Sequence, residues 1–416
     1  MNKTSTIKIF NYQLYDKILL LLLISSTFLF PKIIIDPLFP AFRIEDILLI
    51  PITIRLIQLK PTINFHIKLI ALFGIYIFMV IIINGRIGCI RDYFEICKLL
   101  KLVILILFLS LPQYVEYAKK LFLPIFIVLI VFNVFQYFNL FDFNTTIEKL
   151  YSPEHHLKYF GLNSDFTVST KRLLGTMGNP NTNGILFLFF IVQFLPLKND
   201  DSFWKYLLYL SAVFICIHTQ SRTAFIILSL IFIAHSILEY TLVKKHKMLF
   251  ITFLVILFAD FYSDNLLYLG SLRGTKVKIA DDMELTTTNH SLQTRFEIWK
   301  HLYGMIQQKP LLGHAPYKEY FYENHLYSEN EYILMVWRYG IIGLAFFVVM
   351  ILYPAYKAYK EKSTSNNIKL LAFTTCILFT ALTNNPLSEP RVLVMYAIMA
   401  GLFYAETAGK EVKNLS

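Results

Sequence analysis

The sequence predicts an all-α integral membrane protein of about twelve transmembrane helices, and two observations carry that prediction. Hydrophobic residues make up 56% of the 416 residues and charged residues only 16%, with a mean hydropathy of +0.54. The apolar residues also gather into long uninterrupted runs, and a bilayer requires roughly 20 apolar residues for each spanning helix. A soluble protein of this length would not need so many such runs.

Twelve runs are apolar and long enough to be spans. Apart from these runs, the sequence contains no internal repeat and no low-complexity segment. We therefore expect residues 1–416 to form a single polytopic membrane domain. The predicted spans lie near residues 18–35, 38–59, 66–84, 96–111, 121–141, 184–197, 203–219, 223–243, 248–269, 331–353, 370–383 and 392–404.

The lysines predict the orientation of these spans, because cytoplasmic loops of membrane proteins carry an excess of lysine and arginine. Lysines gather before the first span, in alternate connections and in the tail, for example Lys3, Lys119, Lys244 and Lys410. This pattern predicts cytoplasmic termini and accounts for most of the net charge of +11. Since the lysines are dispersed over short loops and form no continuous stripe, we expect no nucleic-acid partner.

The cysteines and acidic residues indicate neither a disulfide framework nor a metal site. Cys89, Cys97, Cys216 and Cys376 show no CxxC spacing. The acids of the predicted outer loops form no compact aspartate motif and no histidine pair at metal-binding spacing accompanies them. We therefore expect a metal-independent protein without a cofactor.

Two long connections, residues 142–183 and 270–330, fall on the outer face of the predicted topology. The second contains a predicted amphipathic helix at residues 291–309, which Pro310 ends. We expect this helix to lie on the membrane as a lid. Its apolar positions at helical spacing are Leu292, Phe296, Trp299, Leu302 and Ile306.

The ten arginines are distributed against the positive-inside rule, since only Arg55 falls on the cytoplasmic side of the predicted topology. A guanidinium binds phosphate oxygens through two parallel hydrogen bonds and stays charged when partly dehydrated. The distribution therefore favours an external anionic ligand. The arginines in outer loops or at outer ends of spans are Arg43, Arg86, Arg91, Arg172, Arg222, Arg273, Arg295, Arg338 and Arg391.

Some of these arginines have an alternative interpretation. Arg43 has Glu45 and Asp46 nearby and alternatively completes an internal ion pair. Arg86 and Arg91 alternatively lie at the membrane interface with their charged ends in water. The main candidates, which lie in polar segments with turn or cap residues around them, are Arg172, Arg222 and Arg295.

Four segments of the chain follow one another in a characteristic order. They are AFRIEDILLIP at the second predicted span, RLLGTMGNPNTNG before the sixth, TQSRTAF before the eighth, and SLQTRFEIWKHLYGMIQQKPLLGH followed by SENEYILMVWRYGIIGLAFF at the tenth. Together they resemble the O-antigen ligase and polymerase superfamily of bacterial envelope enzymes. The resemblance implies a multispan C-class glycosyltransferase in the cytoplasmic membrane, with a large periplasmic loop over its active site. It also implies undecaprenyl-diphosphate-linked glycans as donor and acceptor, and membrane lipids and a chain-length regulator protein as partners.

The same resemblance implies roles for individual residues. Arg172, Arg222 and Arg295 match arginine positions of the family, where fixed guanidinium groups would stabilise the charge of a departing diphosphate. Ligases of the family carry a His-Asn pair before the tenth span, whereas this chain has Glu329 and Asn330, which is similar to the polymerases. Glu329 would then take the proton from the acceptor hydroxyl as a general base.

The segment SENE also has a structural interpretation that is compatible with this one. Ser328 followed three residues later by Glu331, directly before an apolar run, is typical of a capping box with Ser328 as the N-cap.

Further residues complete the predicted site. His314 and His325 are alternative general bases. Asn179 and Asn181 of GNPNTNG have amides that suit sugar hydroxyls, but the run is also typical of a turn in which Asn183 caps the sixth span. The predicted substrate-binding residues are Arg172, Asn179, Asn181, His218, Asn330, His314, His325, Tyr332 and Arg338.

The sequence favours a polysaccharide polymerase that joins lipid-linked repeat units outside the membrane. An O-antigen ligase that transfers the chain to a lipid A core is the alternative within the same enzyme class. A lipid-linked oligosaccharide flippase or exporter also needs many spans and cationic groups. A transporter, however, would place its charges along a cavity open to both faces.

The orientation can be tested in a chain whose native cysteines have been replaced. A cysteine introduced at Leu285 is expected to react with an impermeant thiol reagent in intact spheroplasts, because residues 270–330 are predicted outside. A cysteine at Lys244 is the control and is expected to react only after lysis. Labelling of Leu285→Cys only after lysis would overturn the orientation.

Overall fold

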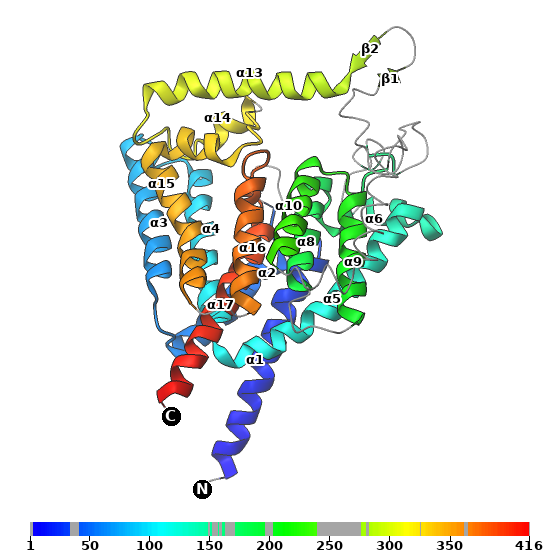
Figure 1. Cartoon of the computed structure of the whole chain (residues 1–416). Coiled ribbons are helices and arrows are strands. Elements are labelled where there is room, and N and C mark those ends of the chain that lie inside the picture. Colours follow the sequence, from blue (N-terminus) through cyan, green and yellow to red (C-terminus); the bar gives the residue numbers. More distant parts are fainter. Residues whose placement is uncertain are drawn as a thin grey trace.

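A computed structural model of the chain describes residues 3–33, 41–148, 150–151, 157, 160–162, 171–195, 203–238, 276–279, 283–324, 326–361 and 365–415. These residues form a bundle in which most long helices run along one direction (Figure 1). Both termini lie at one end of the bundle, whereas residues 283–323 lie at the other (Figure 1). The shared end of the termini agrees with the predicted topology, and which end faces the cytoplasm stays a prediction.

The helices of the first half are α1 (Lys3–Leu29), α2 (Ile44–Leu59), α3 (Phe65–Ile83), α4 (Ile90–Leu109), α5 (Val115–Phe138), α6 (Phe143–Glu148), α8 (Pro180–Gln193) and α9 (Phe203–His218). Short 3-10 helices are η1 (Pro112–Tyr114), η2 (Leu140–Asp142) and η3 (Gly175–Met177). The second half adds α10 (Arg222–Leu238), β1 (Lys276–Ile279), β2 (Met283–Thr286), α13 (Thr287–Gln308), α14 (Lys318–Glu323), α15 (Glu331–Lys360), α16 (Ser365–Thr380), η5 (Pro386–Ser388) and α17 (Pro390–Leu415).

Every predicted span falls on a helix except that near residues 248–269, which lies outside the described residues. In the described part of the chain, four helices are long and apolar enough to cross a membrane, namely Phe65–Ile83, Pro112–Phe138, Glu331–Lys360 and Pro390–Gly409. The count of about twelve spans therefore stays a prediction. The all-α fold class is confirmed, and the described residues add one short antiparallel pair of strands, β1 and β2, with Lys276 opposite Thr286.

Helix α17 forms the centre of the bundle. Every residue from Arg391 to Ala405 is buried, and α4, α16, α8, α5 and α1 pack around it. The segment VLVMYAIMAGLFYA, residues 392–405, is apolar at almost every position. A helix that is apolar all round is stable where neighbours cover each of its faces, which explains its central position.

The start of α8 differs from the predicted one. Asn179 is the N-cap, and its side chain accepts hydrogen bonds from the backbone amides of Asn181 and Thr182. Pro180 is the first helical residue, a position that proline favours because its missing N–H needs no partner there. The predicted cap Asn183 is therefore wrong, and this residue lies buried inside α8.

The start of α15 differs in a similar way. Asn330 is the N-cap and accepts a hydrogen bond from the amide of Ile333. The predicted cap Ser328 is wrong, because Glu331 is the first helical residue and not the third. Glu331 therefore cannot close a capping box with Ser328, and its buried carboxylate instead accepts a hydrogen bond from Ser388 at 3.1 Å.

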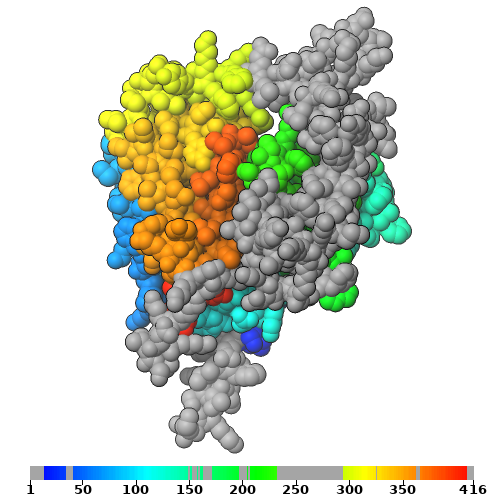
Figure 2. Space-filling model, in the orientation of Figure 1, coloured from blue at the N-terminus to red at the C-terminus, as the bar shows by residue number. Residues whose placement is uncertain are grey.

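Helices α13 and α14 cover the end of α15 (Figure 2). Leu302 of α13 is buried and packs in one apolar cluster with Leu334 and Trp337 of α15. Phe296 was expected on the apolar face of α13 but is 61% exposed. The helix begins at Thr287, four residues before the predicted start, and ends at Gln308, just before Pro310.

Helix α15 is interrupted at Gly340, which has a φ of +65°. The segment before α14 inserts at this interruption, since Ile341 donates its amide hydrogen bond to the carbonyl of Pro310 at 2.9 Å. His314 likewise donates its amide hydrogen bond to the carbonyl of Trp337 at 3.0 Å. Only glycine adopts this conformation without strain, and a side chain at residue 340 would overlap the Leu311 backbone.

We expect Gly340→Ala to destabilise the protein by more than about 1 kcal/mol, because both the positive φ and the overlap with Leu311 oppose a methyl group. Thermal unfolding of the purified full chain measures this effect. Gly304→Ala in α13 is the control, because nothing lies within 4 Å of the added carbon. Equal melting temperatures for the two variants would contradict the proposed constraint at Gly340.

Candidate functional site

The candidate site lies at the beginning of α15, whose first turn is fixed by the loop of residues 381–385. The amide of Glu331 donates a hydrogen bond to the carbonyl of Ala381 at 2.8 Å. The Asn330 side chain donates another to the carbonyl of Leu382 at 3.0 Å. Asn330 thus has a structural role as cap and anchor, and it holds the neighbouring residue in a constant position.

Glu329 precedes this cap and forms an ion pair with Arg295 of α13. The Arg295 side chain is 27% exposed and the Glu329 side chain 42%, although the Glu329 Oε2 atom at the contact is itself buried. Glu329 also has a φ of +45°, in the left-handed region that is rare for residues other than glycine. The residues predicted to be catalytic are Glu329, Arg222 and Arg295, and the structure brings Glu329 and Arg295 together.

Arg172 lies beside the N-terminal turn of α8. Its guanidinium donates hydrogen bonds to the carbonyl of Thr219 at 3.3 Å and to the Asn181 side chain at 3.4 Å. The Asn181 amide in turn donates to the side-chain oxygen of Asn384 at 3.2 Å. Two predicted binding residues, Arg172 and Asn181, are thus joined to the loop 381–385. The Asn179 oxygen serves the helix cap.

Arg222 is the first residue of α10 and is exposed. The Ser221 hydroxyl accepts a hydrogen bond from the amide of Ala224 at 3.4 Å and so caps this helix. The hydroxyl of Thr223 lies 2.5 Å from that of Thr383. The start of α10, with Arg222, therefore also meets the loop 381–385.

The loop 381–385 is the common neighbour of these candidates. Its carbonyls hold the first turn of α15, Thr383 contacts the start of α10, and Asn384 contacts the start of α8. The sequence alone does not predict a role for this loop. The available signal was its run TNNP, a polar turn between two apolar spans.

Other predicted site residues have structural contacts. His314 is 8% exposed and its Nε2 lies 2.8 Å from the carbonyl of Met305. The Tyr332 hydroxyl donates to the carbonyl of Leu378 at 2.8 Å. His218 Nδ1 lies 2.9 Å from the carbonyl of Phe214 in its own helix. These contacts favour supporting roles. His325 lies outside the described residues.

Arg338 is 2% exposed and belongs to a buried cluster of charges below the first turn of α15. The cluster centres on the carboxylate of Glu95 in α4, which pairs with Lys318 of α14. Lys98 lies 3.1 Å from this carboxylate and Arg338 lies 3.9 Å from it. Burial lowers the pKa of the Lys318 ammonium, while the Glu95 carboxylate acts in the opposite direction. Arg338 is thus buried beside Glu95, and its predicted substrate contact stays a prediction.

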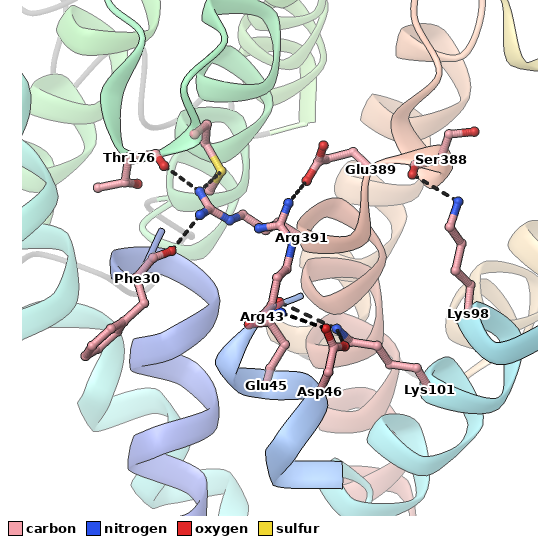
Figure 3. A network of polar contacts seen from close by, with 11 residues as sticks. Phe30, Arg43, Glu45, Asp46, Lys98, Lys101, Thr176, Ser388, Glu389 and Arg391 are labelled. Atoms are coloured by element: carbon pink, nitrogen blue, oxygen red, sulfur yellow. Dashed lines mark hydrogen bonds and ion pairs between the residues drawn. The ribbon is translucent and has the colours of Figure 1, made fainter. Parts of the chain in front are cut away.

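A second buried network joins α2, α4 and the start of α17 (Figure 3). Arg43 donates a hydrogen bond to the Glu389 carboxylate at 2.6 Å. Lys101 lies 2.6 Å from Asp46 and 3.5 Å from Glu45. Arg43 thus completes an internal ion pair, as its alternative interpretation predicted. The carboxylate partner of Arg43 is Glu389. The two acids near Arg43 in sequence, Glu45 and Asp46, pair with Lys101 instead.

Two further arginines also have internal partners. Arg391 donates hydrogen bonds to the carbonyls of Phe30 at 2.6 Å and Thr176 at 2.5 Å (Figure 3). Arg86 donates to the Asp92 carboxylate at 2.5 Å, and its side chain is only 15% exposed. The interfacial interpretation of Arg86 is therefore wrong, because a buried carboxylate compensates its charge.

The described residues contain no group of three His, Cys, Asp or Glu side chains placed to hold a metal ion. Metal independence stays a prediction.

The buried Glu95 cluster yields a stability prediction. Glu95→Gln is expected to destabilise the protein by about 3–5 kcal/mol, because it leaves buried cations without their carboxylate. Adding Lys318→Met is expected to restore part of this loss in a double-mutant cycle. Thermal unfolding measures both effects. Glu116→Gln is the control, since the Glu116 side chain is 81% exposed, and an equally small effect at both glutamates would contradict the prediction.

Comparison with protein families matches residues 207–348 to the family described as O-antigen ligase. The matched segment runs from α9 into α15 and includes Arg222, Arg295 and Glu329. None of the curated proteins compared matches the chain. The family match does not separate polymerases from ligases. It agrees with the resemblance found in the sequence: residues 207–348 of this chain are similar to the O-antigen ligase family.

Proposed function

We propose that the protein is a polysaccharide polymerase that joins undecaprenyl-diphosphate-linked oligosaccharide repeat units on the outer side of the bacterial cytoplasmic membrane. The observation that carries this proposal is the gathering of Arg172, Arg222 and the Arg295–Glu329 pair around the loop 381–385. Cations beside one carboxylate suit a reaction that releases an anion and removes a proton. The family match supports a glycosyltransferase-like activity.

In the proposed reaction, the hydroxyl oxygen of the acceptor glycan attacks the anomeric carbon of the donor. The bond between that carbon and the diphosphate oxygen breaks, and undecaprenyl diphosphate leaves with the bonding electrons. Glu329 accepts the proton of the hydroxyl as the new bond forms. Arg172, Arg222 and Arg295 stabilise the charge that develops on the diphosphate, because guanidinium groups fixed by the fold need no reorganisation.

Two alternatives predict different products. A ligase would transfer the chain to a lipid A core, and the Glu329-Asn330 pair favours the polymerase because ligases of the family carry His-Asn. A flippase or exporter would move the lipid-linked glycan without making a bond. The loop that follows α16 and the start of α15 lie at the α13 end of the bundle (Figure 1), which supports an enzyme acting on one side of the membrane over a transporter.

The decisive experiment incubates the purified full chain with one lipid-linked repeat unit and no other acceptor. We expect a ladder of products, because the repeat unit serves as both donor and acceptor. We expect the same ladder in the presence of EDTA, because the arginines rather than a metal ion stabilise the charge of the leaving group. Product formation only after addition of lipid A core would identify a ligase. An unchanged repeat unit in both assays, with transport across proteoliposomes, would identify a flippase.

Arginine variants in the same assay connect the activity to the site. Arg172→Ala and Arg222→Ala are expected to lower elongation by about 10²-fold or more, because each removes a stabilising donor. The corresponding lysine variants should recover little, since an ammonium cannot form the bidentate contact. Arg91→Ala is the control, as Arg91 lies at the start of α4 outside the candidate site. Near-normal lysine variants would contradict bidentate binding.

A further inference from the structure

We propose that the Glu329 carboxylate occupies, on Arg295, the place that the donor diphosphate takes, so that donor binding releases the general base. This inference rests on the proposed function. It adds a coupling between two steps, because the group that binds the leaving diphosphate also restrains the group that removes the proton. The observation behind it is the ion pair between Arg295 of α13 and Glu329.

The ion pair has the properties of an exchangeable contact. Both side chains are partly exposed, at 27% and 42%, and such pairs are only weakly stabilising in water. A diphosphate carries more charge than a carboxylate and offers several oxygens to the guanidinium fork. The diphosphate is therefore the stronger ligand of Arg295, and Glu329 is the displaceable one.

The surroundings allow Glu329 to be released without movement of the helices. The indole of Trp299 donates a hydrogen bond to the carbonyl of Ser328 at 2.6 Å, which fixes α13 to this segment independently of the ion pair. Asn330 and Glu331 are anchored to the loop 381–385. Among residues 328–331, Glu329 is the one whose side chain forms its described polar contact with a partly exposed charged group, the Arg295 guanidinium of α13.

The backbone at Glu329 supports the same conclusion. Its φ of +45° is costly for a residue with a side chain, and such conformations persist where the surroundings determine them. Here the anchored residues on both sides impose the conformation, and it directs the Glu329 side chain to Arg295. The Glu329 carboxylate and the Arg295 guanidinium are thus held together beside the N-terminus of α15.

The exchange changes the chemistry of Glu329. While Glu329 is paired with Arg295, its carboxylate oxygen is engaged by the guanidinium, and release leaves that oxygen free to accept the proton of the acceptor hydroxyl. Donor binding therefore converts Glu329 from a paired carboxylate into an effective base. Proton removal from the acceptor hydroxyl then occurs only when a diphosphate leaving group is in place, which predicts that donor binding precedes activation of the acceptor.

The test uses inorganic pyrophosphate as the probe and titration calorimetry of the purified full chain. Glu329→Gln removes the competing charge and is expected to bind pyrophosphate at least about twofold more tightly than the parent chain, a modest gain because exposed ion pairs are weak. The same variant is expected to elongate the glycan about a hundredfold more slowly, because the base is lost. A purely structural role of Glu329 would not produce opposite changes in affinity and rate.

Glu297→Gln is the matched control, because Glu297 is an exposed acid on the same helix, two residues from Arg295. It removes an equal charge and is expected to leave pyrophosphate affinity and elongation unchanged. Equal affinities of Glu329→Gln and the parent chain, or equal gains in both glutamine variants, would overturn the inference and leave the proposed function intact. Absence of pyrophosphate binding in the parent chain and in Glu329→Gln would overturn the anion site itself.

Discussion

The hydrogen bonds between the loop 381–385 and the first turn of α15 are the constraint on which the candidate site depends. The Ala381 and Leu382 carbonyls hold Glu331 and Asn330, so the residue before the cap has a defined position. Through Thr383 and Asn384 the same loop reaches the starts of α10 and α8. A short polar loop thus aligns three helix N-termini, each of which carries or adjoins a candidate residue. These N-termini add partial positive charge to that of the arginines.

The sequence predicted the helices well because each membrane helix is indicated by the apolar residues of its own segment. The span at residues 66–84 differs from α3 by one residue at each end, and the span at residues 203–219 differs from α9 by one residue at its C-terminal end. Arginine type and position also indicated Arg172, Arg222 and Arg295, which the structure groups around one loop. The partners of the charges were not predictable, because they come from distant segments. Arg43 pairs with Glu389, 346 positions away, while the nearby acids pair with Lys101.

Helix starts were mispredicted for a related reason. Several residues of GNPNTNG and SENE can cap a helix, and the choice among them depends on contacts that sequence spacing does not contain. In α8 the position of Pro180 determines the first helical residue, and this proline is visible in the sequence. In α15 the first helical residue is determined by the distant carbonyls that accept hydrogen bonds from Asn330 and Glu331. The buried charges around Glu95 have the same origin, since α4, α14 and α15 each contribute to them.

The central position of α17 has a consequence for biogenesis. This helix leaves the ribosome after α1, α4, α5, α8 and α16, which are the helices that surround it. Until it arrives, the carbonyls of Phe30 and Thr176 lack the Arg391 guanidinium, and the faces that the surrounding helices pack against α17 stay uncovered. The earlier helices must therefore be kept apart from proteases and from each other during insertion. A nascent chain that stops before Pro390 would present the membrane quality-control machinery with an open bundle.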